Sequence, residues 1–461
     1  MQSIKSHDYF KIYQNQLNQK SSNEQYYSKI PFNTKILVFF AFVLIFRITI
    51  LVRKRPVEDF AVIDDFAMIE IVAVGLTILF LFFSSNLKEV VNYLSKSSAK
   101  VLLIYCIVSI VSSLWSPIAG YTFFRAVQVA SQLLVVFVVL YEFKSFSSAE
   151  QFVLRAGSLL MVINLLGQFK LVKYDFSFAG LHSNTYSNSA AMIFCYCFHE
   201  YFESSGKDRK RFRNYGLFNL LGIVIGTSAT SNIATLISIF FARFIFYKKI
   251  SIGMLSLTML VIIITVLFSQ NILNREVSDI ILAGKDPHSV RTMSGRMHIW
   301  TTYIEVAKER LILGHGFAIT TRIGALRVNT AHNVSLAIAL DLGIAGLFLF
   351  LWGGLRLVRE SIQPGPQPMR GRLGALSVFI AAFIACQSTP FIATHWHAPN
   401  AVFALFLALH TLYLRSPALA ASSSSTPIGL RRERFVRDVW SRRFRKPLSS
   451  QKKLHDSSLI R

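Results

Sequence analysis

The chain has 461 residues, of which 53% are hydrophobic and only 16% are charged, and its mean hydropathy is +0.46. A soluble domain carries about 25% charged residues, so this composition excludes an ordinary soluble enzyme and indicates a polytopic membrane protein. The formal net charge of +25 is compatible with binding to nucleic acid. In a membrane protein, however, an excess of Lys and Arg usually marks cytoplasmic loops.

Apolar stretches long enough to cross a bilayer, about 20 residues each, recur along most of the chain. The first 35 residues are polar, with no small-residue cleavage site after the first apolar run, so we expect a cytoplasmic segment at 1–35 instead of a cleavable signal. We predict an all-α fold with about twelve transmembrane helices, at 36–52, 66–83, 100–116, 121–141, 152–170, 184–203, 215–229, 230–248, 250–270, 332–357, 373–393 and 399–414.

The predicted spans divide the chain into five parts. Helices 1–9 occupy 36–270, a large loop with short helices occupies 271–331, helices 10–12 occupy 332–414, and a basic cytoplasmic tail occupies 415–461. Between the seventh and eighth spans, seven small or polar residues at 226–232 predict a tight turn.

The basic residues give the orientation. With both termini inside, most Lys and Arg side chains fall in cytoplasmic segments, as the positive-inside rule requires; the exception, Arg53-Lys54-Arg55, shares its loop with four acidic residues. The loop at 271–331 and His332 then lie outside the cytoplasm. We expect the tail to contact anionic inner-leaflet lipid and predict no nucleic-acid partner.

Cysteine and histidine patterns do not predict a metal site. The four cysteines lie in apolar runs, and Cys195 and Cys197, two apart on a helix, point in nearly opposite directions; we interpret all four as small hydrophobic residues. The sequence His395-Trp396-His397 is more typical of an interfacial aromatic belt than of a metal ligand pair.

Charged residues inside predicted spans are expensive and are usually paired or functional. Arg125 belongs to a polar stripe on one helical face, formed by Tyr121, Arg125, Gln128 and Gln132. We expect this stripe to face the bundle or a wet cleft and Arg125 to bind substrate, with snorkelling to the interface as the alternative. Arg47 and Glu70 are predicted to pair with each other.

Arginines gather in the outer loop, against the usual charge bias. Arg291, Arg296, Arg322 and Arg327 lie there, around a predicted surface helix at 301–310 and a turn at 313–317. Guanidinium groups match phosphate oxygens in geometry and charge, so the loop predicts anion binding; scattered solvated charge is the alternative.

A histidine stands where this loop meets the tenth span. With an unperturbed pKa of about 6.5, an imidazole accepts a proton at neutral pH, so His332 is a candidate general base. A helix-capping role is the alternative for His332, and Asn333 is expected to cap the helix or to orient the imidazole.

Several of these residues form a pattern. The string His332-Asn333, nine residues, Gly343, two residues, Gly346 resembles the signature of the bacterial O-antigen ligase and polysaccharide polymerase superfamily. Ser294-Gly295-Arg296-x-x-x-Trp300 with the glycine-rich turn at 313–317 looks like the outer-loop pattern of the same family. The stretch 179–184, which contains His182, is similar to its Gly-x-x-His-x-Asn element.

The resemblance implies a metal-independent, cofactor-free glycosyltransferase of the GT-C-type fold in the bacterial inner membrane. Its donor would be an undecaprenyl-diphosphate-linked glycan at the periplasmic face, and its acceptor another carrier-linked glycan or the lipid A core. Arg296 would bind the diphosphate and His332 would act as base, while the other substrate-binding candidates are Arg125, Arg291, Arg322, Arg327, Asn333 and His182.

One departure from the family pattern bears on the choice of acceptor. Many ligases carry a Ser-Arg pair at the outer end of a middle span, but the corresponding stretch 228–232 has no arginine. This difference slightly favours a polymerase over a ligase. A transporter or flippase is the alternative of another class; it predicts charges at mid-bilayer and broken helices in matching halves.

Overall fold

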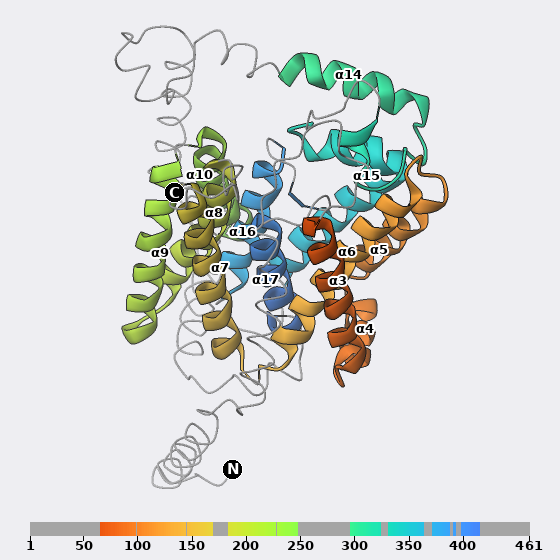
Figure 1. Ribbon diagram of the computed structural model, residues 1–461. Helices are drawn as coiled ribbons and strands as arrows, with labels where there is room; N and C mark the ends of the chain where they lie inside the picture. Colours follow the sequence, from red (N-terminus) through yellow and green to blue (C-terminus); the bar gives the residue numbers. More distant parts are fainter. Residues whose placement is uncertain are drawn as a thin grey trace, which may run out of the picture.

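The computed structural model describes residues 65–97, 99–143, 145–168, 183–226, 228–247, 296–323, 331–363, 371–387, 391–392 and 398–414. All regular structure in these ranges is helical (Figure 1). The all-α prediction is therefore confirmed for the described part of the chain. The predicted spans at 36–52 and 250–270, the N-terminal segment and the basic tail lie outside it.

Many of the helices pack side by side as a bundle, and α14 lies across one end of it (Figure 1). In chain order they are α3 (Asp65–Phe83), α4 (Leu87–Lys96), α5 (Lys100–Val111), η2 (Ser112–Leu114), α6 (Ala119–Tyr141), α7 (Phe146–Gln168), α8 (Ser183–Glu203), α9 (Gly206–Gly226), α10 (Ala229–Tyr247), α14 (Arg296–Glu309), η3 (Thr320–Arg322), α15 (Val334–Ile362), α16 (Arg372–Ala385), α17 (Ala398–Leu409) and the π-helix η5 (His410–Leu414).

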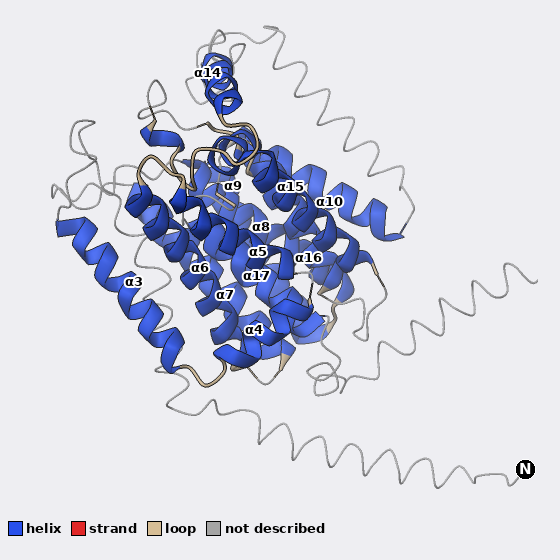
Figure 2. Ribbon diagram, turned by 90° about the vertical axis from the view of Figure 1, so that its right-hand side faces the viewer, coloured by secondary structure: helices blue, strands red, loops and turns tan. Residues whose placement is uncertain are grey.

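Two of the described helices, α6 and α15, are long and apolar enough to cross a membrane. A third crossing is obtained if α3 and α4, which are bent by 88° at a short break, form one broken span. Figure 2 shows α3 at the edge of the bundle. Other apolar helices, such as α16 and α17, are shorter, so the count of twelve spans stays a prediction.

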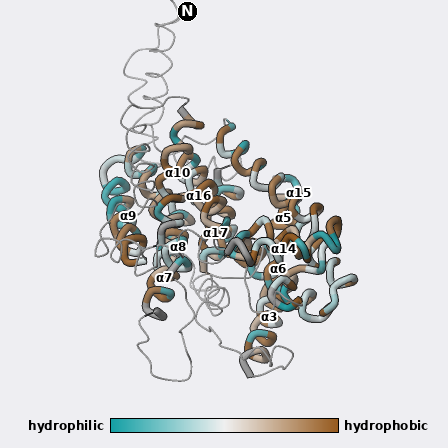
Figure 3. Tube along the Cα trace, turned by 90° about the horizontal axis from the view of Figure 1, so that it is seen from above, coloured by the Kyte–Doolittle hydropathy of each residue, from teal (hydrophilic) through white to brown (hydrophobic). Residues whose placement is uncertain are grey.

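Helix α9 begins well before the apolar stretch that predicted it. Its first turns carry Lys207, Arg209, Lys210 and Arg213, and the apolar residues follow; Figure 3 accordingly shows both hydrophilic and hydrophobic stretches on α9. Lys and Arg are good helix formers, so the helix extends through the polar segment that a hydrophobicity criterion excludes.

Hydrogen bonds between helix ends define one layer of the bundle. Arg211 of α9 pairs with Glu150 of α7 at 2.6 Å, and the backbone N–H of Gly371, just before α16, donates to Glu200 of α8 at 2.8 Å. These contacts bring the starts of α7, α9 and α16 together with the end of α8.

The same layer continues across α4 and the ends of α15 and α17. The Tyr93 hydroxyl donates to the carbonyl of Thr411 at 2.8 Å, and Ser361 Oγ lies 3.1 Å from His410 Nε2. We call this layer the basic end, because its segments carry Lys88, Lys96, Lys100, Lys207, Arg209, Lys210, Arg211, Arg213, Arg356, Arg359 and Arg372. The opposite layer, which holds α14 and the start of α15, is the site end (Figure 1).

Helix α15 is broken at Gly343, whose φ of 64° and ψ of −163° are not helical. The predicted span at 332–357 thus contains a break that the sequence analysis did not predict. A break inside an apolar helix leaves backbone groups without their helical partners, which is costly in a membrane. Here the loop after α14 supplies the partners.

Four backbone hydrogen bonds join the 311–316 loop to the break. His315 and Gly316 donate to the carbonyls of Leu340 and Asp341 at 2.9 and 2.8 Å, and Leu311 and Ile312 accept from the two residues that follow Gly343 at 2.9 and 3.3 Å. A Cβ on Gly343 would overlap the carbonyl of Ile312. Glycine is therefore needed at this position for its positive φ and for the close approach of the loop.

Candidate active site

The structure describes half of the predicted site residues in full. Arg125 lies on α6, Arg322 ends η3, and His332 and Asn333 precede α15. Arg296 is the first residue of α14, five residues before the predicted start of that helix. Arg291, Arg327 and His182 lie outside the described residues.

Arg125 is held by an acidic residue of the neighbouring helix α3. Its Nη1 donates to Glu70 Oε1 at 2.6 Å and to Gln128 Oε1 at 2.8 Å, and the Gln128 amide also donates to Glu70 at 2.9 Å. About one fifth of each charged side chain remains exposed, 21% for Arg125 and 23% for Glu70. The predicted polar stripe thus faces α3, and Glu70, predicted to pair with Arg47, pairs with Arg125; Arg47 lies outside the described residues.

A second arginine meets the same stripe. The guanidinium carbon of Arg322 lies 4.0 Å from the centroid of the Tyr121 ring, and that of Arg125 lies 5.3 Å from it. Both distances are within the range of a cation–π contact. Two cations distant in sequence therefore gather around one aromatic ring, an arrangement that an anion would stabilise by neutralising their mutual repulsion.

His332 lies in a strained turn between two fixed neighbours. Its φ of 46° is in the left-handed region, which is uncommon for a non-glycine residue and is often found at functional sites. Trp300 Nε1 donates to the carbonyl of Ala331 at 2.7 Å, and Val334 N–H donates to the carbonyl of Cys386 at 3.1 Å. The neighbours thus fix the position of the half-buried His332.

Asn333 has the capping role that the sequence allows. Its side-chain oxygen accepts a hydrogen bond from Leu336 N–H at 3.0 Å, the usual geometry of a helix N-cap. Asn333 therefore stabilises the first turn of α15 directly after the histidine.

A small apolar cluster brings these elements together. Tyr303 of α14, Ile319 of the loop and Ala331 form its buried core, and Tyr121 and Ile323 pack against it. Because Ile323 follows Arg322 and Ala331 precedes His332, the arginine and the histidine both extend from the same cluster. Trp300 lies one helical turn after Arg296, so the bond from Trp300 to Ala331 also draws the start of α14 toward His332.

Two residues of the site end were not singled out by the sequence. Asp341 of α15 is buried and accepts three backbone hydrogen bonds from the loop. Tyr303 is also buried, and its hydroxyl contacts Thr320 and the backbone of Ala331; burial, and then the nearby Asp341 carboxylate, raise the pKa of Tyr303 above its ordinary value. An acid inside an apolar run is itself a signal of function or pairing, so Asp341 was detectable.

The described residues do not gather three or more His, Cys, Asp or Glu side chains in a way that could hold a metal ion. All four cysteines are buried and carry free thiols, as expected for small hydrophobic residues. The site end also holds the guanidinium groups of Arg125 and Arg322, and guanidinium groups suit a negatively charged ligand.

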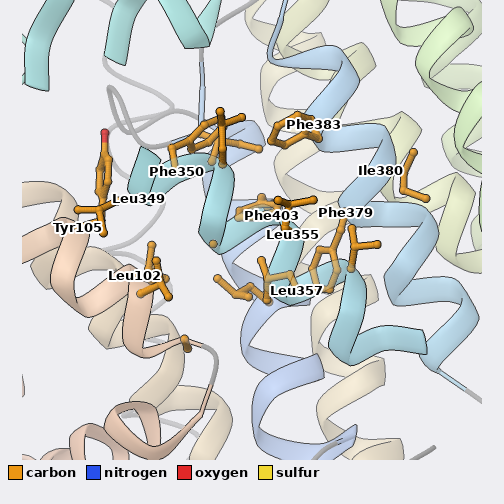
Figure 4. Close-up of a pocket in the computed structure, with 18 of the residues that line it drawn as sticks. Leu102, Tyr105, Leu349, Phe350, Leu355, Leu357, Phe379, Ile380, Phe383 and Phe403 are labelled. Carbon is orange, nitrogen blue, oxygen red and sulfur yellow. The ribbon is translucent and has the colours of Figure 1, made fainter. Parts of the chain in front are cut away.

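An apolar groove of about 400 Å³ lies between α5, α15, α16 and α17. Figure 4 shows Leu102 and Tyr105 on the α5 side and Phe350 and Phe383 on the far side. The Tyr105 ring packs edge-on against Phe317, with 6.4 Å between the centroids, and Phe317 belongs to the loop docked at the break in α15. The groove therefore begins beneath the site-end loop and has the volume of a typical ligand pocket.

The apolar helices indicate the class of the chain, a helical membrane protein, and one end of its bundle gathers Arg125, Arg322 and His332. The model of the O-antigen ligase family matches residues 215–351, from within α9 to within α15. This match covers less than half of the chain and supports membership of the O-antigen ligase and polysaccharide polymerase superfamily. Members of this family are glycosyltransferase-like enzymes. No curated protein matches the chain.

Proposed function

We propose that this protein is a GT-C-type glycosyltransferase of the bacterial inner membrane that takes a glycan from undecaprenyl diphosphate at the periplasmic face. The observation that carries this proposal is the placement of Arg125 and Arg322 on the Tyr121 ring, in the apolar cluster from which His332 extends. Such a site supplies fixed positive charge for a diphosphate and a proton acceptor for a hydroxyl.

In the proposed reaction, the acceptor hydroxyl oxygen forms a bond to the anomeric carbon of the donor sugar. The bond from that carbon to the diphosphate oxygen breaks, and its electrons leave with the polyprenyl diphosphate. His332 takes the hydroxyl proton, a contribution of about 10²- to 10⁴-fold in rate. Fixed guanidinium groups stabilise the negative charge on the leaving group without reorganisation, so the proposed step needs neither a metal ion nor a nucleotide.

The arginines would divide between the two phosphates. Arg322 and Arg125 both lie at the Tyr121 ring, while Arg296 begins α14, the helix whose Trp300 donates to the carbonyl of Ala331. We assign the diphosphate to Arg296, Arg322 and Arg125, with Arg291, Arg327 and His182 as further contacts to the glycan or the carrier. The apolar groove beneath the loop would hold part of the polyprenyl chain.

A polymerase, which adds the glycan to another carrier-linked repeat, is our first choice. The stretch where many ligases have a second arginine contains Ser231, whose hydroxyl donates to Asn188 Oδ1 at 2.6 Å and lies 3.0 Å from the Ser228 hydroxyl. These buried hydroxyl and amide groups have no charge with which to bind phosphate. Transfer to the lipid A core remains the alternative, and a flippase is the alternative of another class.

The test is a glycan ladder from a deletion strain that expresses single variants. Arg296→Ala and His332→Ala are expected to abolish glycan transfer while the protein still inserts, and Arg356→Ala, an exposed arginine of the basic end, serves as the matched control. Loss of polymerase leaves single repeat units, whereas loss of ligase leaves long carrier-linked chains. Normal ladders from both site variants would contradict the proposal.

A further inference from the structure

Asp341 lies in α15, two residues before the break at Gly343, and only 2% of it is exposed. Its Oδ2 accepts a hydrogen bond from Ala318 N–H at 3.0 Å, and its Oδ1 accepts from Ile319 and Thr320 N–H at 3.1 Å each. One carboxylate therefore satisfies three consecutive backbone donors of a loop that lies more than twenty residues away in sequence.

The three donors lead directly into the short helix that carries Arg322. Thr320 is the first residue of η3 and Arg322 is the last, so the Asp341 carboxylate sits at the start of that turn. The backbone carbonyl of Asp341 also accepts from Gly316 at 2.8 Å. Asp341 thus binds the loop through both its own side-chain carboxylate and its own main-chain carbonyl.

Helix α15, which carries Asp341, begins at Val334, two residues after His332. The Asp341 side chain therefore connects the segment of Arg322 to the helix that follows His332. Three donors converge on two oxygens, a geometry that an uncharged amide cannot reproduce, because its NH₂ group would face a backbone N–H.

We propose that Asp341 is a positioning residue, which sets Arg322 against Tyr121 and in a fixed place relative to His332, so that binding of the polyprenyl diphosphate depends on Asp341 without contact between them. The inference rests on the proposed function. It differs from a purely structural role because it predicts a loss of diphosphate affinity in protein that remains folded.

The variant Asp341→Asn tests this, with Glu150→Gln as the matched control. Glu150 is also a buried carboxylate with two donors, Tyr196 and Arg211, but it lies at the basic end. The probe is farnesyl diphosphate, whose Kd is measured on purified full-length protein in lipid nanodiscs. We expect Asp341→Asn to raise this Kd about tenfold. The loop that places Arg322 is then held less firmly, and loss of one hydrogen bond to a charged group is an effect of about this size. Glu150→Gln is expected to leave the Kd unchanged.

Amide hydrogen exchange on the same samples provides the readout of position. In the wild-type protein the amides of 318–320 are expected to be protected, and in Asp341→Asn they are expected to exchange faster while the rest of the bundle keeps its protection. Rapid exchange of these amides in the wild-type protein would overturn the inference without any variant. Should Asp341→Asn fail to insert, Asp341→Glu, which keeps the charge but displaces both oxygens, replaces it with the same expected direction.

The outcomes separate the two proposals. If the wild-type protein binds farnesyl diphosphate and Arg322→Ala weakens binding, but Asp341→Asn leaves the Kd unchanged, the positioning role is wrong and the proposed function stands. If the wild-type protein does not bind the probe, both are wrong.

Discussion

The charged side chains at the two ends of the bundle differ in their burial and in their partners. At the basic end, Glu150 is fully buried and accepts hydrogen bonds from Tyr196 and Arg211, both at 2.6 Å. At the site end, Arg125 is partly exposed, pairs with Glu70 and shares the Tyr121 ring with a second cation, Arg322. Buried charges that are fully paired hold helices together, whereas partly exposed like charges that share one place are typical of a binding site.

The largest effect is expected from His332→Asn. Asparagine tolerates the left-handed backbone found at this position but cannot act as a general base, so transfer should fall by about 10²- to 10⁴-fold with little change in melting temperature. Turnover of a carrier-linked donor in proteoliposomes measures this. Turnover close to that of the wild type would remove His332 from the proposed mechanism.

At the basic end, Glu150→Ala should lower the stability of the fold and leave the activity per folded molecule unchanged. It leaves Arg211 without its buried partner, which costs about 3–5 kcal/mol for a fully buried pair; Arg211 is 16% exposed and lies 3.4 Å from Asp208, so the lower part of that range is expected. Thermal unfolding in detergent and activity per folded molecule are the measurements. A specific loss of turnover would show that the two ends are not separate in function.

Gly343→Ala changes the connection between the loop and α15. Alanine is strained by about 1–3 kcal/mol at the φ of 64° and ψ of −163° found here, and its Cβ would overlap the loop carbonyl of Ile312. We expect a lower melting temperature and weaker binding of farnesyl diphosphate, because the loop that leads to Arg322 is displaced. Gly75→Ala, where a Cβ meets nothing within 4 Å, is the control and should change neither quantity.

The smallest effect is expected from Glu70→Gln. The amide keeps a hydrogen-bond acceptor for Arg125 but removes the negative charge that competes with a phosphate. Partly exposed ion pairs are worth about 0.2–1 kcal/mol, so binding of farnesyl diphosphate should strengthen by a few-fold at most, and less at high salt. Weaker binding would mean that Glu70 serves mainly to orient Arg125.

Much of the helical fold follows from the sequence, because apolar runs of the right length select helices in a membrane protein. Several described helices coincide with predicted stretches, as α6 and α8 do, whereas α4 lies between two predicted spans. The same criterion missed the polar first half of α9, since Lys and Arg form helices outside the bilayer as well as loops. It also missed the break at Gly343, which depends on a loop some thirty residues earlier in the chain.

The candidate site was predictable in its residue types and only partly in its contacts. Arg125, Arg322 and His332 stand out because charge or an imidazole is unusual in their sequence context. Their partners are not visible in the sequence, because the pairing of Glu70 with Arg125 depends on two helices being neighbours. Asp341 was visible as an acid in an apolar run, but its role appears only once the three loop amides are placed around it.

The central claim is that guanidinium groups and an imidazole at one end of the bundle remove a glycan from a lipid diphosphate. Its most direct test is glycan transfer from a purified undecaprenyl-diphosphate donor by the wild-type protein and by Arg322→Ala, both in proteoliposomes. We predict that the wild type transfers the glycan to the acceptor and that Arg322→Ala does so at a small fraction of that rate. Equal rates for the two proteins, or no transfer by the wild type, would contradict the claim.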